Sequence, residues 1–462
     1  SARMGKIKPG ADNGGFSGSL TQRIVKALGV FTGVQSAGML CSVIRAKLIA
    51  MWIGPAGVGL NALLTNALDV LSQLSQAGIR VSAVRSIAAT DDGRERTGLI
   101  TALLRWALWL GSGGAVLTML LSPLLSLLTF GDYSYSWMFV VLAVAVLASA
   151  LSVGRSAALQ GIGELKRLAT LTVTAVIIST LLAIPLFYFF RLKSIVWVVT
   201  LFAVVQAAVF YIDPGHRGSH RSDLSHRQCF RIGMPFIRLG LVLTMSNALT
   251  MVSNFVITVF LNRYASTDEV GIFQAGFAII NNYMGILVSA LTVEYFPRLS
   301  ANIANRRRSE VLVSHQLMIL MSLLVPGVIV FLIFSRQIVW LLYSADFMDA
   351  VPYLTFAVGG GVLRMISSCM ALCMLAAADS RAYMLTELGS AFTGLVLAIG
   401  GYMLGGIAGM GVAYLLWYAL YTVAVWAIYS FRYRMRVRSR ALRIIMPGLA
   451  LIAAAQIIAA CM

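Results

Sequence analysis

The sequence predicts an all-α integral membrane protein made of two six-helix bundles, and three observations support this prediction. The 462 residues are 59 % hydrophobic and only 11 % charged, which is far outside the range of soluble domains. The apolar runs are about 20 residues long, the length that a helix needs to cross a bilayer, and they lack the alternation of barrel strands. A basic segment near the middle of the chain separates two halves that resemble each other.

The apolar runs predict twelve membrane spans and a weaker thirteenth. Six lie in the first half, at 26–52, 59–83, 98–122, 137–156, 169–190 and 195–212. Six lie in the second, at 236–260, 271–296, 311–334, 351–376, 383–403 and 407–430. The thirteenth, 444–460, either crosses the membrane as an accessory helix or lies at its interface.

These spans divide the chain into five parts. We expect a cytoplasmic tail (1–25), a first bundle (26–212), a basic cytoplasmic linker (213–235), a second bundle (236–430), and a basic segment with the extra helix (431–462).

The cations between the spans predict the orientation. With the N-terminus in the cytoplasm, the cytoplasmic segments hold 25 Lys and Arg residues, and the opposite segments hold four: Arg191, Lys193, Arg263 and Arg336. Loops rich in Lys and Arg remain cytoplasmic. The net charge of +19 is therefore attributed to topology and to contact with anionic lipids, and no nucleic-acid partner is expected.

An internal duplication is visible in three short patterns that occur in the same order in both halves. The matching pairs are Val58-Gly59 with Val270-Gly271, Arg85 with Arg298, and Leu127-Leu128 with Leu341-Leu342. The offset grows slowly from 212 to 214 residues. Because a repeat of six spans enters the membrane in the same direction each time, we expect a pseudo-two-fold axis along the membrane normal and a cleft between the halves.

Three cations and one acid fall deep within the predicted spans. Arg45 and Lys47 lie in the first span, Arg364 lies halfway along the tenth, and Asp69 lies midway along the second. Asn281 occupies the position that matches Asp69 in the second half. A charge near the bilayer centre costs at least ~2.5 kcal/mol, so these groups are expected to face a central cavity that attracts an anion. The alternative is that Arg45 and Lys47 snorkel to the interface.

Other polar residues in the spans have two interpretations each. Arg80, Arg238 and Glu294 lie near the cytoplasmic ends, where they either gate the cavity or snorkel. Asn247 and Asn254 are seven residues apart and therefore share a helical face. They either hydrogen-bond to sugar hydroxyls or join helices.

Signatures of catalysis and of cofactor binding do not occur. The sequence has no nucleophile paired with a histidine and no phosphate-binding glycine loop. The linker contains His216, His220, His226 and Cys229, but a solvated basic segment explains them better than a metal site does. A transporter without a cofactor is therefore expected.

Several motifs carry a family resemblance. The segment IGPAGVGLNALL that leads to QAGI at Gln76–Ile79, DEVGIFQAG at Asp268–Gly276 and LLYSADF at Leu341–Phe347 resemble the Wzx-type flippases of lipid-linked oligosaccharides. These flippases form the polysaccharide transporter branch of the multidrug/oligosaccharidyl-lipid/polysaccharide (MOP) superfamily. The likeness covers residues 43–376 and is strongest to the flippases of O-antigen and enterobacterial common antigen.

The resemblance implies a V-shaped protein of the bacterial inner membrane. It would move an undecaprenyl-diphosphate-linked repeat unit, such as a unit of the O-antigen of lipopolysaccharide, from the cytoplasmic to the periplasmic leaflet by alternating access. Glycan polymerases and chain-length proteins are the implied partners. Lys47 would match a cation that precedes the GPAG turn, and Asn281 stands where the antigen flippase has an acid, which is a departure from the family pattern.

The residues and the resemblance together give a mechanism. Arg45, Lys47 and Arg364 would hold the diphosphate or an anionic glycan, and the membrane potential would drive it outward, with H⁺ or Na⁺ exchange at Asp69 as a second coupling.

Two other functions remain open. One is a small-molecule/cation antiporter of the related multidrug (MATE) branch, which would carry mainly acids in its cavity. The other is a membrane glycan polymerase or ligase, which would carry a large periplasmic loop.

Overall fold

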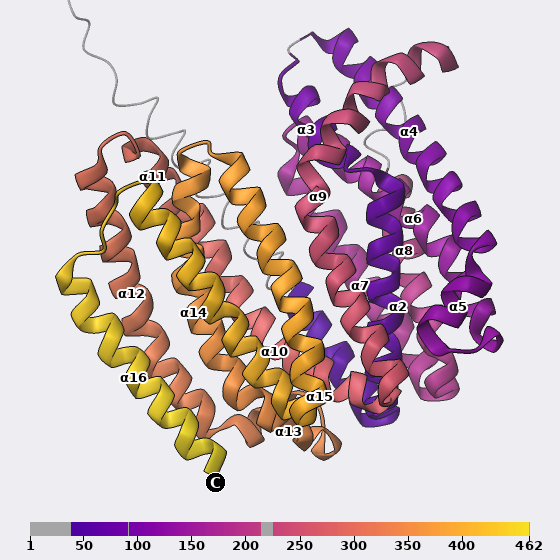
Figure 1. Ribbon diagram of the computed structural model, residues 1–462. Helices are drawn as coiled ribbons and strands as arrows, with labels where there is room; N and C mark the ends of the chain where they lie inside the picture. Colours follow the sequence, from indigo (N-terminus) through magenta and orange to yellow (C-terminus); the bar gives the residue numbers. More distant parts are fainter. Residues whose placement is uncertain (1–37, 91, 214–224, 462) are drawn as a thin grey trace, which may run out of the picture.

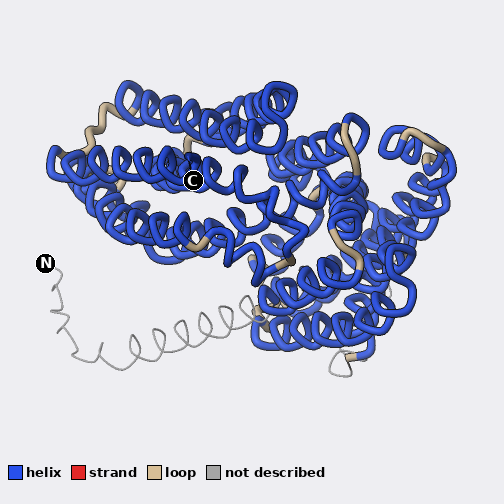
Figure 2. The backbone as a smooth tube through the Cα atoms, turned by 90° about the horizontal axis from the view of Figure 1, so that it is seen from below, coloured by secondary structure: helices blue, strands red, loops and turns tan. Residues whose placement is uncertain are grey.

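The computed structural model describes residues 38–90, 92–213 and 225–461. Every regular element in these ranges is a helix, and no strand occurs there (Figure 2). The predicted tail (1–25) and residues 214–224 of the predicted linker (213–235) lie outside the described residues. Residues 38–52 form the first described helix. The later helices are α2 (Pro55–Gln76), α3 (Ile79–Ala88), α4 (Gly93–Leu120), α5 (Ser122–Phe130), α6 (Ser136–Gly161), α7 (Leu165–Phe190), α8 (Ser194–Ile212), α9 (His226–Tyr264), α10 (Thr267–Ala290), α11 (Phe296–Asn302), α12 (Arg306–Ile333), α13 (Ser335–Leu342), α14 (Val351–Ala376), α15 (Ser380–Ala427) and α16 (Ser439–Cys461).

Eight helical segments of the described chain are long and apolar enough to cross a membrane. Two of them, Leu165–Ile212 and Ser380–Arg432, each contain two consecutive predicted spans. The first of these segments changes direction between α7 and α8, and the second at Gly405 and Gly406. Gly406 has a φ of 59° and a ψ of −145°, a conformation that favours glycine. The helix at 38–52, α2 and α9 are not among the eight, although they overlap the other three predicted spans.

One predicted span boundary is wrong. The sequence predicts a single span over 59–83, but α2 ends at Gln76 and a separate helix, α3, begins at Ile79. Ala77 and Gly78 between them have φ values of 48° and 67°, in the left-handed region. A Cβ on Gly78 would lie 2.3 Å from the carbonyl oxygen of Gly240, so α9 passes directly against this turn.

The helices form two groups that are joined at one end (Figure 1). We call the end that carries the α8–α9 and α11–α12 connections the basic end, and the opposite end the far end. Helices α2 to α8 form the first group, and α10 to α16 form the second. α9 packs against α2, α3 and α4 of the first group and also against α10 and α15 of the second. In Figure 1 the groups diverge toward the basic end.

The first group also fixes the basic end of α9. A separate apolar core contains side chains of α3, α4 and α6 together with Phe236 of α9. The Ser82 hydroxyl donates to the Phe236 carbonyl at 2.6 Å, and the Trp106 indole donates to the Cys229 carbonyl at 3.0 Å. This half of α9 is therefore built into the first group.

Two duplicated glycines make the closest contact between the groups. A Cβ on Gly59 of α2 would lie 2.0 Å from the carbonyl oxygen of Thr267, and a Cβ on Gly271 of α10 would lie 2.0 Å from that of Pro55. The backbones of α2 and α10 therefore touch, as small residues allow between membrane helices. The Val-Gly pairs that reveal the duplication in the sequence meet each other here.

Near this contact each half donates hydrogen bonds to a short helix of the other half. The Lys47 ammonium donates to the carbonyls of Trp340 (2.9 Å) and Tyr343 (2.5 Å) at the end of α13. Arg263 at the end of α9 donates to the carbonyl of Leu127 (2.5 Å) in the last turn of α5. The last carbonyls of a helix lack partners within it and attract cations. We call these two contacts the far-end latches.

The predicted thirteenth helix is present as α16. It packs against α12 and α14 and runs alongside them (Figure 1). The buried Gln456 amide donates to the carbonyls of Thr355 (2.8 Å) and Phe356 (3.1 Å) of α14. α16 therefore has the orientation of a spanning helix and not of an interfacial one.

We predict that Gly59→Ala destabilises the protein, because the added methyl group cannot be placed without separating α2 from α10. Overpacking typically lowers the free energy of unfolding by about 1–3 kcal/mol, so the thermal unfolding midpoint in detergent should fall by at least about 3 °C. The matched control is Gly113→Ala in α4, where a Cβ has no atom within 4 Å. Equal midpoints for the two variants would contradict the close contact.

We also predict that Lys47→Gln loosens the far end. Spin labels at the exposed positions Tyr133 and Gln337 should report longer distances by pulsed electron paramagnetic resonance. Loss of a latch worth about 1 kcal/mol changes the ratio of two states about fivefold. Lys193→Gln removes an exposed charge at the same end and should leave the distances unchanged. A Lys47→Gln distribution identical to that of the parent protein would show that the latch does not hold the halves together.

Candidate functional site

Three neighbouring cavities lie between the first helix and α15. The Arg45 cavity, of about 250 Å³, is lined by the first helix, α2, α10 and the end of α13. The Arg364 cavity, also of about 250 Å³, is lined by α9, α10, α14 and both arms of α15. A small space of about 40 Å³, the amide junction, shares residues with both. Neighbouring cavities share lining residues, and we call the row of three cavities the path.

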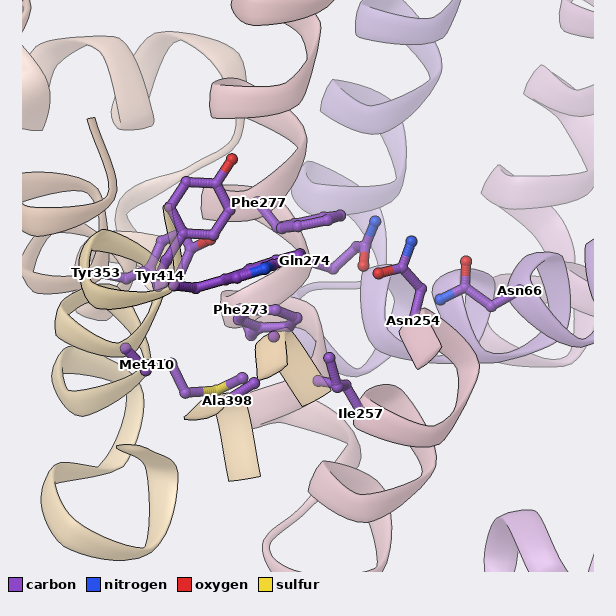
Figure 3. Close-up of a pocket in the computed structure, with 13 residues that line it drawn as sticks. Asn66, Asn254, Ile257, Phe273, Gln274, Phe277, Tyr353, Ala398, Met410 and Tyr414 are labelled. Carbon is purple, nitrogen blue, oxygen red and sulfur yellow. The ribbon is translucent and has the colours of Figure 1, made fainter. Parts of the chain in front are cut away.

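The amide junction brings together Asn66 of α2, Asn254 of α9 and Gln274 of α10. The three amides lie at one edge of a space lined by aromatic rings, including those of Phe273 and Tyr414 (Figure 3). The Asn66 amide also donates to the hydroxyl of Thr258 at 3.0 Å. Amides beside aromatic faces are groups that can contact sugar hydroxyls and sugar rings.

Arg45 faces its cavity from the first helix. The lining positions Met39, Ser42, Ala46 and Ile49 follow helical spacing, so one stripe of this helix forms the wall. Arg45 lies nine residues before Gly54, or roughly 14 Å at 1.5 Å per residue, which places it well within the membrane.

The Arg45 guanidinium is held by an aromatic ring. Its central carbon lies 4.2 Å from the ring centroid of Phe202 in α8, a cation–π contact. Among the described residues, none accepts a hydrogen bond from this guanidinium, and no acid lines the Arg45 cavity. Its donors therefore remain available to an anion.

Arg364 lies in a different environment. Its Nη1 donates to the Asn281 amide oxygen at 2.6 Å, and its guanidinium carbon lies 5.7 Å from the Tyr418 ring centroid. Glu387, which accepts from the Tyr421 hydroxyl at 2.5 Å, lines the same cavity. The positive charge here is thus partly compensated.

The other deep charges lie elsewhere. Lys47 belongs to a far-end latch and not to the lining of the three cavities. Asp69 also lies outside the lining, and its side chain makes no hydrogen bond or ion pair within the described ranges. The sequence predicts three cations and one acid, Asp69, around the cavity. In the structure, the charged residues that line the three cavities are Arg45, Arg364 and Glu387.

The predicted gate residues that the structure describes have local partners. Arg80 is exposed and lies 3.5 Å from the Gln160 amide oxygen of its own group. Glu294 pairs with Arg298 one turn away at 2.9 Å, and both are well exposed. Arg238 and Asn247 belong to α9, but their side chains are not among those that the structure describes. Asn254 lines both the amide junction and the Arg364 cavity.

Two of the four His and Cys residues of the linker, for which a solvated segment is expected rather than a metal site, lie in the described part of the chain. His216 and His220 lie outside the described residues, and the His226 ring lies 5.9 Å from that of Trp109. Cys229 contributes its carbonyl to the contact with Trp106.

Several lining residues were not singled out in the sequence. Gln274 lies seven residues before Asn281 and eight before Asn282, a spacing that puts polar groups on one face of α10 and could have identified it. Asn66 and Glu387 have no comparable signal, because their roles depend on contacts with α9 and with Tyr421.

The arrangement suits binding rather than covalent chemistry. A guanidinium with free donors lies at one end of the path, amides and aromatic rings lie in the middle, and a compensated guanidinium lies at the other end. Such groups can bind a polar molecule that carries negative charge.

The fold resembles that of solved MOP-superfamily transporters. An inward-facing multidrug resistance MATE family transporter of the MOP superfamily is 13 % identical, with 86 % of this chain and 94 % of that chain covered and a TM-score of 0.71. The lipid II flippase MurJ, in an inward closed conformation, is 13 % identical, with coverages of 92 % and 91 % and a TM-score of 0.68. A MOP superfamily transporter from Pyrococcus furiosus, described as having a binding pocket of reverse polarity, is 14 % identical, with coverages of 93 % and 96 % and a TM-score of 0.60.

Sequence comparison identifies the family. No curated protein sequence matches this chain. The model of the polysaccharide biosynthesis protein family matches residues 24–303, which is more than half of the chain. The protein therefore belongs to the polysaccharide biosynthesis protein family and has the fold of a MOP-superfamily membrane transporter.

Proposed function

We propose that this protein is a flippase that moves a lipid-linked oligosaccharide across the bacterial inner membrane, from the cytoplasmic to the periplasmic leaflet. The observation that carries the proposal is Arg45, which lines a cavity between the two halves and whose guanidinium has no hydrogen-bond acceptor among the described residues. Such a group is costly unless an anion binds it. The family match and the flippase among the structural neighbours support the same conclusion.

The proposed substrate is an undecaprenyl-diphosphate-linked repeat unit of the O-antigen or of a similar surface glycan. Its diphosphate would bind Arg45, since guanidinium groups bind phosphate oxygens through paired hydrogen bonds. The sugars would lie in the Arg45 cavity against the amides of Asn66 and Gln274, on the side toward Arg364, because the junction of about 40 Å³ is too small for a sugar ring. Glycan polymerases and chain-length proteins would take up the product, and anionic lipids would contact the basic end.

The proposed cycle is alternating access. With the N-terminus in the cytoplasm, the basic end faces the cytoplasm, and the groups diverge on the side from which the substrate enters (Figure 1). Opening toward the periplasm would require both far-end latches to break. In a cell that is negative inside, outward movement of negative charge is favoured by ~2.3 kcal/mol per charge per 100 mV, and H⁺ or Na⁺ exchange at Asp69 would add to this.

The second candidate is a small-molecule/cation antiporter. The MATE transporters among the structural neighbours and Glu387 in the wall of the Arg364 cavity favour it. The Arg45 cavity argues for the flippase, because an organic cation would be repelled there.

We predict that Arg45→Ala lowers translocation at least tenfold, because removal of a charged hydrogen-bonding group costs roughly 1.5–3 kcal/mol. The assay uses proteoliposomes with a fluorescent undecaprenyl-diphosphate oligosaccharide. Arg45→Lys should keep part of the activity, and Lys193→Ala, an exposed cation at the far end, should keep all of it. Absence of flipping by the parent protein, with uptake of an organic cation against a Na⁺ or H⁺ gradient, would support the antiporter instead.

We also predict that Arg364→Ala abolishes translocation and that Asn281→Asp impairs it strongly. An aspartate would place a carboxylate beside Arg364 and neutralise the charge offered to the substrate. Asn281→Leu removes the hydrogen bond without adding charge and should have the milder effect. Equal activities of the Asp and Leu variants would show that the charge of Arg364 is not used.

A further inference from the structure

A groove at the far end of the second group lies between α16 and the helices that it covers. It has a volume of about 410 Å³, which is larger than the Arg45 or the Arg364 cavity, and α12, α13, α14 and α16 line it. The C-terminus of α16 and the short helix α13 lie at the same end of the molecule (Figure 1). The groove shares no lining residue with the three cavities of the path, so it is a separate site.

Helix α16 creates this groove, which we call the α16 groove. Ala455, Ile458 and Ala459 follow helical spacing and form one wall, where the two small alanines leave room beside α14. Gln456, on the next face of the helix, holds α16 in place through its hydrogen bonds to α14. A protein with only the twelve spans of the two bundles would lack the groove.

The lining is apolar except for one charge and two hydroxyl groups. The charge is Arg336, in the first turn of α13. The hydroxyls of Ser335 and Thr355 both donate to nearby backbone carbonyls, so neither is left to seek a partner. Ile333 and Ile458 are exposed, and the groove is therefore open on the side where the bilayer lies.

Arg336 has no partner in the described part of the chain. Its side chain is exposed and makes no hydrogen bond, ion pair or ring contact with the described residues, and no acid lines the groove. Guanidinium groups bind phosphate oxygens through paired hydrogen bonds. The groove thus places an anion-binding group beside an apolar wall.

We propose that the α16 groove binds an anionic phospholipid from the bilayer leaflet at the far end, with the lipid phosphate at Arg336 and an acyl chain between α12 and α16. The charge selects an anionic lipid, because the ammonium of a zwitterionic lipid would find no acid in the lining. The alternative is that Arg336 snorkels to the headgroups without selecting among them. The proposal does not depend on the proposed flippase function.

The site is joined to a far-end latch through α13. This helix has eight residues, with Arg336 in its first turn, and its Trp340 carbonyl accepts a hydrogen bond from Lys47. A lipid bound at Arg336 would fix the start of α13, while Lys47 holds the end. The second half would then contact a lipid at the helix through which it contacts the first half.

The test is photocrosslinking of the full-length protein in nanodiscs. Two probes, a phosphatidylglycerol and a phosphatidylcholine, carry the same diazirine in one acyl chain, and the ratio of their labelling is compared between helices. The reference helix is α7, which is followed at the far end by the exposed cations Arg191 and Lys193 but does not line the groove. We expect the ratio to be at least about fivefold higher on α12 and α16 than on α7.

Two variants remove the two parts of the site separately. Arg336→Gln changes an exposed side chain and should lower the ratio on α16 to that on α7, whereas Lys193→Gln should leave it unchanged. Ala459→Leu fills the groove without changing the charge and should lower the ratio as well. Its control is Ala454→Leu, at an exposed position of α16 outside the groove. Thermal unfolding midpoints check that each variant is folded.

Three results would overturn the proposal. Equal ratios on α16 and α7 in the parent protein, or an Arg336→Gln ratio like that of the parent, would mean that Arg336 only snorkels. A ratio that Ala459→Leu leaves unchanged would mean that the groove holds no chain. A polyprenyl monophosphate also joins a phosphate to an apolar chain, so stronger displacement of the probe by unlabelled undecaprenyl phosphate than by phosphatidylglycerol would assign the groove to that lipid instead.

Discussion

The contact on which the rest of the structure depends is the one between the backbones of α2 and α10. Gly59 and Gly271 have no side chains, so the two helices touch at the far end, and they separate from there toward the basic end. The Arg45 cavity lies between them, lined by Asn61 and Gln274. Larger residues at the contact would push the helices apart and open the far end. The duplication thus supplies a joint in which each half provides the same small surface.

The two arginines of the path have different physical tasks. The aromatic ring of Phe202 holds Arg45 in position without using its hydrogen-bond donors. Arg364 has an amide acceptor and an acid in the same cavity, so much of its cost in the membrane is already offset. A ligand gains more from Arg45, whereas Arg364 also organises the walls formed by α10 and α15. The difference follows from their neighbours and not from their depth.

Hydropathy, cation distribution and repeated motifs were sufficient to predict the helical membrane fold and its two related halves. They also located Arg45 and Arg364, because a charge inside an apolar run is conspicuous. These patterns could not predict that Lys47, two residues from Arg45, donates to the carbonyls at the end of α13. Every residue has a backbone carbonyl, so the sequence does not show which carbonyls accept a side-chain hydrogen bond. Likewise, the left-handed turn at Ala77 and Gly78 depends on the close passage of α9, which only the folded chain reveals.

The placement of α9 has a mechanical consequence. Its basic end is embedded in the core of the first group, and its other end packs against α10 and α15 of the second. If the groups rock about the glycine joint, α9 cannot follow both as a rigid rod and must flex between its two anchors. Pro235, inside the helix near the first anchor, removes one backbone hydrogen bond and lowers the resistance to bending there. α9 would then act as a flexible link between the two groups, with its bend near Pro235.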